Sequence, residues 1–193
     1  MIEPSATGIA GVFGGLAVAF AVAGPPSSPI AGHPEAPPPA HTGGFGEPTC
    51  LTCHAEYPLD DGIRVALMGV PEVAEIGSVH RIGILVAAEG TLTAGFQLAA
   101  RLQDGRQAGI LRPVDERVVV TPGETPAGEV LFAHHTMVGI GEEERVETMW
   151  TVEWVAPSRP AEVQWHVSGN SANGDQSPYG DLVGAASAGT RVR

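Results

Sequence analysis

The chain has 193 residues, which is enough for one domain of ordinary size with a leader or a tail. Its formal net charge is −12, and all ten of its basic residues are arginine. Because phosphate binding needs clustered basic side chains, this charge argues against nucleic acid as a partner and against anionic membrane surfaces. The 26 glycines and 17 prolines favour short strands and turns over long helices.

Residues 8–24 form an uncharged, mostly apolar run near the N-terminus. The run is short and glycine-rich for a membrane span, and Ala-Val-Ala at 21–23 fits a small-residue cleavage site. Glu3 precedes it without any arginine, which departs from the positive start of a typical signal peptide. We therefore expect residues 1–23 to be a signal peptide or an uncleaved N-terminal anchor, and we expect membrane contact only through such an anchor.

Residues 24–42 are rich in proline and contain almost no large apolar side chains, and this composition continues to Pro48. Such a stretch cannot bury enough apolar surface to offset the entropy lost on ordering. We expect it to be an extended, partly disordered linker.

The motif Cys-Leu-Thr-Cys-His at residues 50–54 contains both cysteines of the chain. In this spacing two thiols add to the two vinyl groups of a haem, and the adjacent histidine reaches the iron. A thioredoxin-like dithiol needs a strand-to-helix context, and a zinc site needs further cysteines or a paired histidine motif. The sequence shows neither the strand-to-helix context nor the further zinc ligands. A redox-active or structural disulfide and half of a zinc site remain as alternatives. We predict one covalent haem c on residues 43–60, bound by Cys50 and Cys53, with His54 as the proximal iron ligand.

Beyond this motif, apolar residues alternate with a period of two in short runs bounded by Gly, Pro, Asp or Asn. About seven such strands indicate an all-β fold, an antiparallel sandwich over residues 61–184, with Trp150, Trp154 and Trp165 in its core. We expect residues 185–193 to be a flexible tail. The runs cover residues 63–69, 77–88, 94–102, 116–120, 128–135, 145–157 and 161–169.

A series of short motifs follows a recognisable order between residues 43 and 183. It comprises a Gly-rich lead-in to Cys-x-x-Cys-His, then Gly-x-Pro, Gly-Phe-Gln-Leu, Ala-Gly, His-Thr, Trp-x-x-x-Trp-x-Ala-Pro, Gly-Asn-x-Ala-Asn-Gly-Asp and Gly-Asp, at residues 43–54, 69–71, 95–98, 108–109, 135–136, 150–157, 169–175 and 180–181. This order resembles bacterial exported proteins with a reeler-like domain, known as choice-of-anchor V proteins. The resemblance implies an immunoglobulin-like β-sandwich preceded by a haem-bearing N-terminal loop.

The sequence leaves the sixth position of the iron open between several donors. His134, His135, Thr136 and Met137 end a predicted strand, where a loop could turn a side chain onto the iron. The resemblance implies that His135, which precedes Thr136, is the distal ligand, with His134 and Met137 as its rivals. A one-residue slip moves a strand side chain to the opposite face, so at most one of the two histidines should reach the iron.

Two other polar segments have simpler interpretations. Asn170, Asn173, Asp175 and Asp181 supply oxygen atoms that calcium could use, but the pattern is more typical of an Asn/Gly/Asp turn. The three consecutive glutamates at 142–144 are expected to form a solvated loop.

Taken together, these features predict an exported monohaem c-type cytochrome, periplasmic or extracellular, that carries electrons through a haem with two axial ligands. Its redox partner protein is not named by the sequence, and no catalytic residue is assigned. One alternative is a cell-surface interaction or adhesion module with a structural or sensing haem, as reeler-type domains suggest. A second is a haem peroxidase-like enzyme, which requires an open sixth position with acid–base groups nearby.

Overall fold

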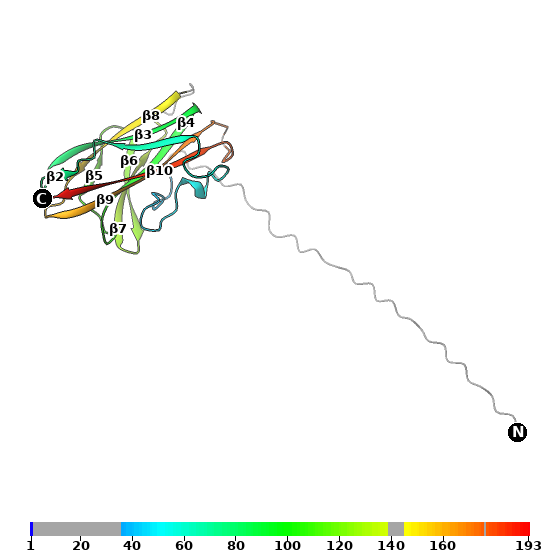
Figure 1. The fold of residues 1–193 in the computed structure, drawn as a ribbon, viewed down its shortest axis with the longest axis horizontal. Helices are drawn as coiled ribbons and strands as arrows, with labels where there is room; N and C mark the ends of the chain where they lie inside the picture. Colours follow the sequence, from blue (N-terminus) through cyan, green and yellow to red (C-terminus); the bar gives the residue numbers. More distant parts are fainter. Residues whose placement is uncertain (2–35, 139–144, 176) are drawn as a thin grey trace.

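Strands make up more than half of the residues that the structure describes, and they pack as two sheets (Figure 1). The computed structural model describes Met1 and residues 36–138, 145–175 and 177–193. The four-stranded sheet has the order β1 (Ile63–Met68), β3 (Val79–Thr91), β8 (Arg145–Val155), β5 (Ile110–Pro113). The six-stranded sheet has the order β2 (Val73–Ala74), β10 (Leu182–Val192), β9 (Ala161–Ala172), β4 (Thr93–Leu102), β7 (Gly128–His135), β6 (Val118–Thr125).

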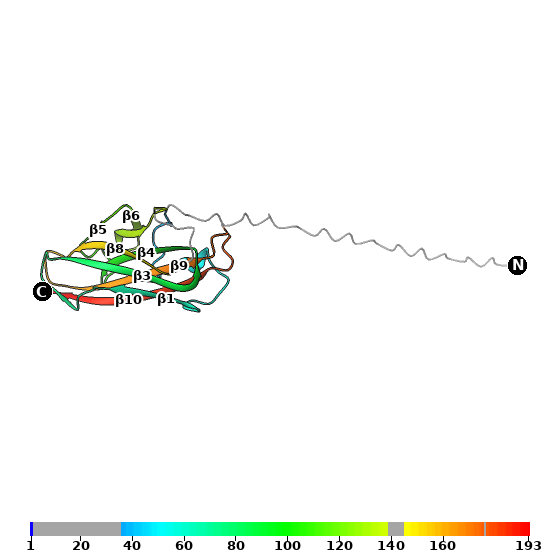
Figure 2. The same cartoon turned by 90° about the horizontal axis from the view of Figure 1, so that it is seen from above.

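The pairing within both sheets is antiparallel, except that the two-residue β2 lies parallel to β10. The strands run roughly along the long axis of the domain in two views at right angles (Figure 1 and Figure 2). The predicted all-β sandwich is therefore confirmed, and each of the seven predicted strands is present. The predicted leader, apart from Met1, and the glutamates at 142–144 lie outside the described residues.

The period of two in the sequence corresponds to the two faces of each strand. In β3, Ile82, Ile84 and Val86 are fully buried between the sheets, whereas Val79 on the opposite face is 56% exposed. Burial of each large aliphatic side chain contributes about 1.5–3 kcal/mol, so the register of β3 is strongly specified.

Three tryptophans join the two sheets, as predicted. Trp154 of β8 meets Trp165 of β9 edge to face, with 5.0 Å between their ring centroids, and Trp150 lies 4.9 Å from Phe96 of β4. The two indole N–H groups at the centre are satisfied, because Trp154 donates to the backbone carbonyl of Ala108 and Trp165 donates to a threonine hydroxyl. Large aromatic side chains can therefore fill this core without leaving a buried donor unpaired.

The prediction of a flexible tail at residues 185–193 was wrong. These residues belong to β10, which pairs with β9 along its whole length and carries β2 on its other edge. Alanine, glycine and serine dominate the strand, so its sequence lacks the large β-branched residues that mark its neighbours. Val192 at its end is nevertheless buried in the core, at 1% exposure.

The outer face of the six-stranded sheet is covered by residues 36–54, which we call the strap. Gln97 of β4 holds it, because its side-chain oxygen accepts the backbone N–H of His41 at 2.6 Å and its amide donates to the carbonyl of Pro38 at 2.9 Å. The described part of the predicted linker, residues 36–42, is thus packed on the sheet rather than disordered. Both faces of β4 are buried as a consequence.

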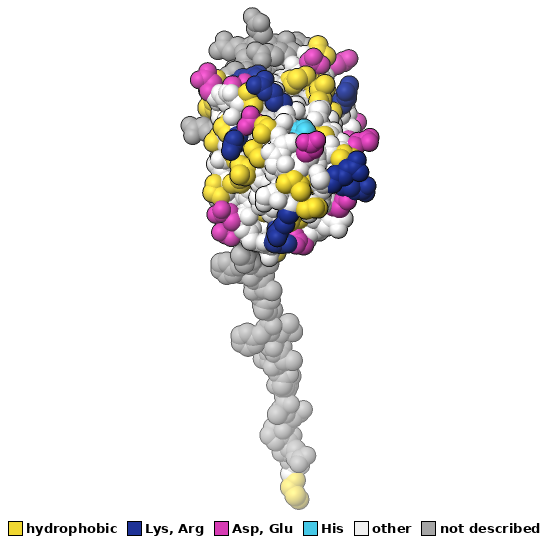
Figure 3. Space-filling model, turned by 90° about the vertical axis from the view of Figure 1, so that its left-hand side faces the viewer, with side chains coloured by type: hydrophobic (Ala, Val, Ile, Leu, Met, Phe, Trp, Pro, Cys, Tyr) yellow, Lys and Arg dark blue, Asp and Glu magenta, His cyan; other side chains and the backbone are white. Residues whose placement is uncertain are grey.

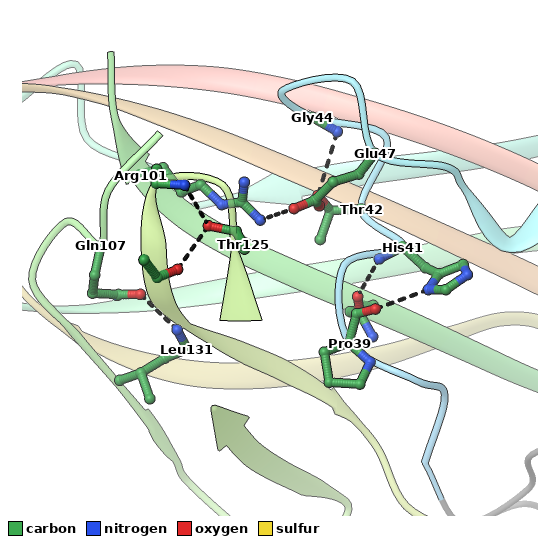
Figure 4. Close-up of polar contacts among 12 residues, drawn as sticks. Pro39, His41, Thr42, Gly44, Glu47, Arg101, Gln107, Thr125 and Leu131 are labelled. Carbon is green, nitrogen blue, oxygen red and sulfur yellow. Dashed lines mark hydrogen bonds and ion pairs between the residues drawn. The ribbon is translucent and has the colours of Figure 1, made fainter. Parts of the chain in front are cut away.

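A buried ion pair fixes the middle of the strap (Figure 4). Arg101 of β4 donates to Glu47, and their side chains are only 3% and 10% exposed. The guanidinium also lies 5.2 Å from the ring centroids of both Phe45 and Phe132. The second carboxylate oxygen of Glu47 accepts the hydroxyl of Thr42 at 2.7 Å. This arrangement satisfies the glutamate inside a poorly hydrated site, where each partner needs the other.

The assignment of β10 predicts a strong dependence of stability on Val192. Val192→Asp places an unpaired charge in the core, so we expect the free energy of unfolding to fall by more than about 3 kcal/mol. Ser187→Asp is the matched control, because Ser187 is an exposed residue of the same strand. Chemical denaturation followed by tryptophan fluorescence measures both. Equal stability of the two variants would mean that this segment does not pack as a strand.

The buried ion pair predicts that Arg101 contributes far more to stability than Arg106 does. Arg101→Met leaves Glu47 buried without its partner, and we expect a loss of about 3–5 kcal/mol in the free energy of unfolding. Arg106→Met is the control, since Arg106 pairs with Asp104 at the surface, and it should have little effect. Adding Glu47→Leu to Arg101→Met should recover part of the loss, because no buried charge then remains. Full stability of Arg101→Met alone would contradict the assignment.

Candidate functional site

The motif at residues 50–54 forms a single tight turn at the end of the strap. The 3₁₀ helix η1 covers Cys50–Thr52, and the Cys50 carbonyl accepts the backbone N–H groups of Cys53 at 3.1 Å and His54 at 3.0 Å. Thr49 caps the turn, because its side-chain oxygen accepts a backbone N–H from it. The turn therefore brings two thiols and one imidazole together on one short, defined piece of backbone.

Ser168 of β9 ties this turn to the sheet. Its hydroxyl oxygen accepts the backbone N–H of Cys50 at 3.2 Å, and its own O–H donates to the carbonyl of Gly184 on β10 at 3.3 Å. Ser168 is fully buried. A small hydroxyl at this outward position of β9 thus anchors the motif across the two central strands.

Both thiols are free, and they do not resemble those of a redox-active dithiol. Burial raises the pKa of Cys50 to about 11, and the hydrogen bond from Ser168 lowers it by less. A reactive cysteine needs the opposite shift. The three-residue turn also lacks the strand-to-helix context of thioredoxin-like sites. Among the described residues, no group of three or more His, Cys, Asp or Glu side chains is placed to hold a metal ion, so the zinc alternative has no further ligands.

His54 is oriented by a carboxylate from the far end of the chain. Its Nδ1 donates to Oδ2 of Asp181 at 2.5 Å, and the Asp181 side chain is 1% exposed, whereas that of His54 is 25% exposed. The Nε2 atom of His54 has no hydrogen-bond partner among the described residues. A histidine that binds a metal through one ring nitrogen commonly donates the other N–H to a carboxylate, and His54 shows this arrangement.

His135 occupies the point where two strands of the six-stranded sheet stop pairing. The β4–β7 ladder contains only the partners Gln97–His134 and Leu98–Ala133. At the next position the His135 ring replaces the backbone of β7, and its Nδ1 accepts the backbone N–H of Phe96 at 3.1 Å and lies 3.3 Å from the carbonyl oxygen of Phe96. A neutral ring can accept from that N–H or donate to that carbonyl through Nδ1, but not both. In the tautomer that donates to this carbonyl, Nε2 carries a free lone pair and can bind a metal.

Burial keeps the His135 imidazole neutral at physiological pH. It lowers the pKa of His135 to about 4, the hydrogen bond to Phe96 opposes this shift, and the charges of His134 and His54 lower the pKa further. A neutral imidazole is the form that binds a metal ion.

Glycine at position 95 makes room for this ring. A Cβ atom on Gly95 would lie 2.6 Å from Cε1 of His135 and 2.7 Å from Oδ1 of Asn170 on β9. No side chain fits between them. The first residue of the Gly-Phe-Gln-Leu motif must therefore be glycine, because any larger residue would displace His135.

The rivals of His135 are placed differently. His134 is 1% exposed, and both of its ring nitrogens are engaged, with the Thr121 hydroxyl at 3.0 Å and the carbonyl of His135 at 3.3 Å. Burial lowers the pKa of His134 as well. Met137 follows the strand and is 53% exposed, so it is far less buried than His135. The geometry favours His135 over both rivals as an iron ligand, and this choice stays a prediction.

His54 and His135 are supported at the same end of the sandwich. Asp181 immediately precedes β10, His135 docks on β4, and β9 lies between these two strands. Neighbouring strands are about 4.8 Å apart, so the two supports are roughly 10 Å apart. Two imidazoles with free Nε2 atoms, two thiols and a common end of the sheet form a donor set that fits a covalently attached haem.

Asp181 was not predicted as part of this site. It is 127 residues from His54, and no spacing rule connects the two. The residues around it form the expected turn, in which Asn173 and Asp175 exchange hydrogen bonds between side chains and backbone. Asp181 accepts the backbone N–H of Asn173 at 3.3 Å with the oxygen that His54 leaves free. The carboxylate that calcium would need is therefore already engaged.

A cleft of about 850 Å³ lies at the opposite end of the sandwich, where β4 ends and β5 and β9 begin. Figure 3 shows this end, where hydrophobic, acidic and basic side chains are interspersed. The cleft contains no histidine or cysteine, and we assign it no role in the site. Its lining includes Leu102, Asp104, Arg106, Ile110, Val155, Arg159 and Glu162.

Within the described ranges, no helix is long and apolar enough to cross a membrane.

No protein-family model and no curated protein matches the chain. Similar solved structures include the human F-spondin reeler domain, at 16% identity and a TM-score of 0.41, covering 71% of this chain and 93% of that one. A cohesin module of a Clostridium perfringens family 33 glycoside hydrolase is 13% identical with a TM-score of 0.43, covering 68% and 96%.

Proposed function

We propose that this protein is an extracytoplasmic monohaem c-type cytochrome, in which Cys50 and Cys53 hold the haem and His54 and His135 bind its iron. The observation that carries the proposal is the shared arrangement of the two histidines. Each has Nδ1 engaged by a buried group of the fold, and each leaves Nε2 without a partner among the described residues. The two free thiols lie within four residues of His54.

When bound, a haem supplies one-electron chemistry at its iron. The chain contributes attachment, orientation and a low-dielectric setting. Cys50 and Cys53 fix the position of the group, and Ser168 fixes the turn that carries them. His54 belongs to the strap, and His135 is the last residue of β7. Because the fold already holds each imidazole through Nδ1, the two rings would need little reorganisation to bind such a group.

Export is part of the proposal. Covalent attachment of this kind occurs outside the cytoplasm in bacteria, and the apolar run near the N-terminus fits a signal peptide or anchor. A net charge of −12 suits a redox partner with a basic surface.

Covalent attachment is the first test. The protein, expressed with a cytochrome c maturation system, should retain haem on a denaturing gel, since thioether links survive unfolding. The double variant Cys50→Ala, Cys53→Ala should lose all of the stain. Ser177→Ala is a matched control, because Ser177 is a half-buried loop residue outside the motif. An unstained wild-type band would reject the cytochrome and leave the exported interaction module as the function to pursue.

The distal ligand is the second test. We expect a low-spin spectrum for the wild type and an almost complete conversion to high spin in His135→Ala, because that variant loses a strong axial donor. His134→Ala and Met137→Ala are the controls and should remain low-spin. Visible and paramagnetic-resonance spectra of each variant decide the point.

Two outcomes would contradict this assignment. A low-spin His135→Ala protein would reject His135 as a ligand, and a change confined to Met137→Ala would identify the methionine instead. A five-coordinate, high-spin wild type would favour the peroxidase-like alternative, with His135 as a distal acid–base group rather than a ligand.

A further inference from the structure

We infer that Asp181 is a positioning residue for His54, which selects the ring tautomer that can bind iron and lowers the reduction potential of that iron. The second part rests on the proposed function. The first part concerns the chain alone and is open to test without haem.

The Asp181 carboxylate is buried and is held in place as a hydrogen-bond acceptor. Its side chain is 1% exposed and accepts two hydrogen bonds, one from the backbone N–H of Asn173 on Oδ1 and one from His54 on Oδ2. The His54 bond is 2.5 Å long, which is shorter than the roughly 2.7–2.9 Å usual for a charge-assisted bond from an N–H group to a carboxylate. No other side chain in the described residues contacts Nδ1 of His54. Asp181 alone therefore determines whether Nδ1 carries the proton.

The tautomer follows from this contact. A carboxylate only accepts hydrogen bonds, so Nδ1 must carry the proton, and Nε2 is left with its lone pair. Because the Asp181 side chain is buried at the start of β10, it also fixes the plane of the ring. The proximal ligand is thus prepared before any metal arrives.

The effect on potential follows from ligand basicity. A short hydrogen bond to a buried carboxylate gives the imidazole anionic character, which raises its donor strength toward the iron. Stronger donation and the nearby negative charge stabilise the ferric over the ferrous state. The potential should therefore be lower than with a neutral acceptor at this position.

The variant Asp181→Asn tests both parts, because asparagine keeps the shape of the side chain and removes its charge. Asp61→Asn is the matched control. Asp61 is an exposed carboxylate seven residues after His54, and its side chain makes no contact with His54. Asp181→Glu restores a carboxylate and should recover part of the wild-type behaviour.

In the haem-free protein, nitrogen-15 NMR of the histidine rings should show His54 with its proton on Nδ1 in the wild type and in Asp61→Asn. This signal should be lost or shifted in Asp181→Asn. A proton on Nε2 of wild-type His54, or an unchanged signal in Asp181→Asn, would overturn the positioning role. This arm holds whether or not the haem stain is positive.

In the haem-loaded protein, redox titration should show a higher midpoint potential for Asp181→Asn. We expect at least a tenfold change in the ratio of ferric to ferrous protein at a fixed potential, which corresponds to about 59 mV for a one-electron couple. Asp61→Asn should stay within twofold of the wild type. A haem-stained Asp181→Asn protein with an unchanged potential would reject the second part alone, whereas absence of haem from the wild type would reject the proposed function.

Discussion

The burial of Arg101 against Glu47 is the interaction on which the rest of the site depends. An arginine near the end of β4 would be costly on a buried sheet face without an anion beside it. The strap supplies that anion, and its phenylalanine covers the guanidinium. Since Glu47 lies only three residues before Cys50, the same contact that closes the sheet also delivers the cysteine turn to the end of β9.

A second constraint acts at the end of β4. The backbone N–H and carbonyl of Phe96 would lack ladder partners where β7 diverges, and the ring of His135 lies against both. Buried backbone groups are almost always paired, so a side chain that can accept or donate is needed at this position. Structural need and ligand chemistry thus converge on one histidine, and Gly95 supplies the space for its ring.

Much of the fold could be predicted from the sequence, because the period of two is explicit wherever large apolar residues alternate. Ile82, Ile84 and Val86 determine the face of β3 without further information. β10 was missed because its small residues have no such alternation, and its place in the sheet depends on long-range pairing with β9. The first part of the strap was predicted to be a linker for a related reason, since its ordering comes from Gln97, more than 50 residues away.

The site divides in the same way. Local chemistry identified Cys50, Cys53 and His54 from five consecutive residues, but the partner of His54 lies across the fold and has no local signal. The distinction between His134 and His135 also required the structure, because it depends on where the ladder with β4 ends rather than on strand alternation alone.

The two histidines that we propose as iron ligands come from parts of the chain with different supports, and this has a consequence for folding. His135 belongs to the sheet, whereas His54 belongs to the strap, which Arg101 and Gln97 hold without any cofactor. A group bound to both would join the strap to the sheet at a further point and would stabilise the folded state by its preferential binding to it. Because the other anchors persist, removing the distal bond should free the end of the strap near η1 and leave the tryptophan core intact. The sandwich is therefore a scaffold that is complete before the cofactor chemistry is added to its edge.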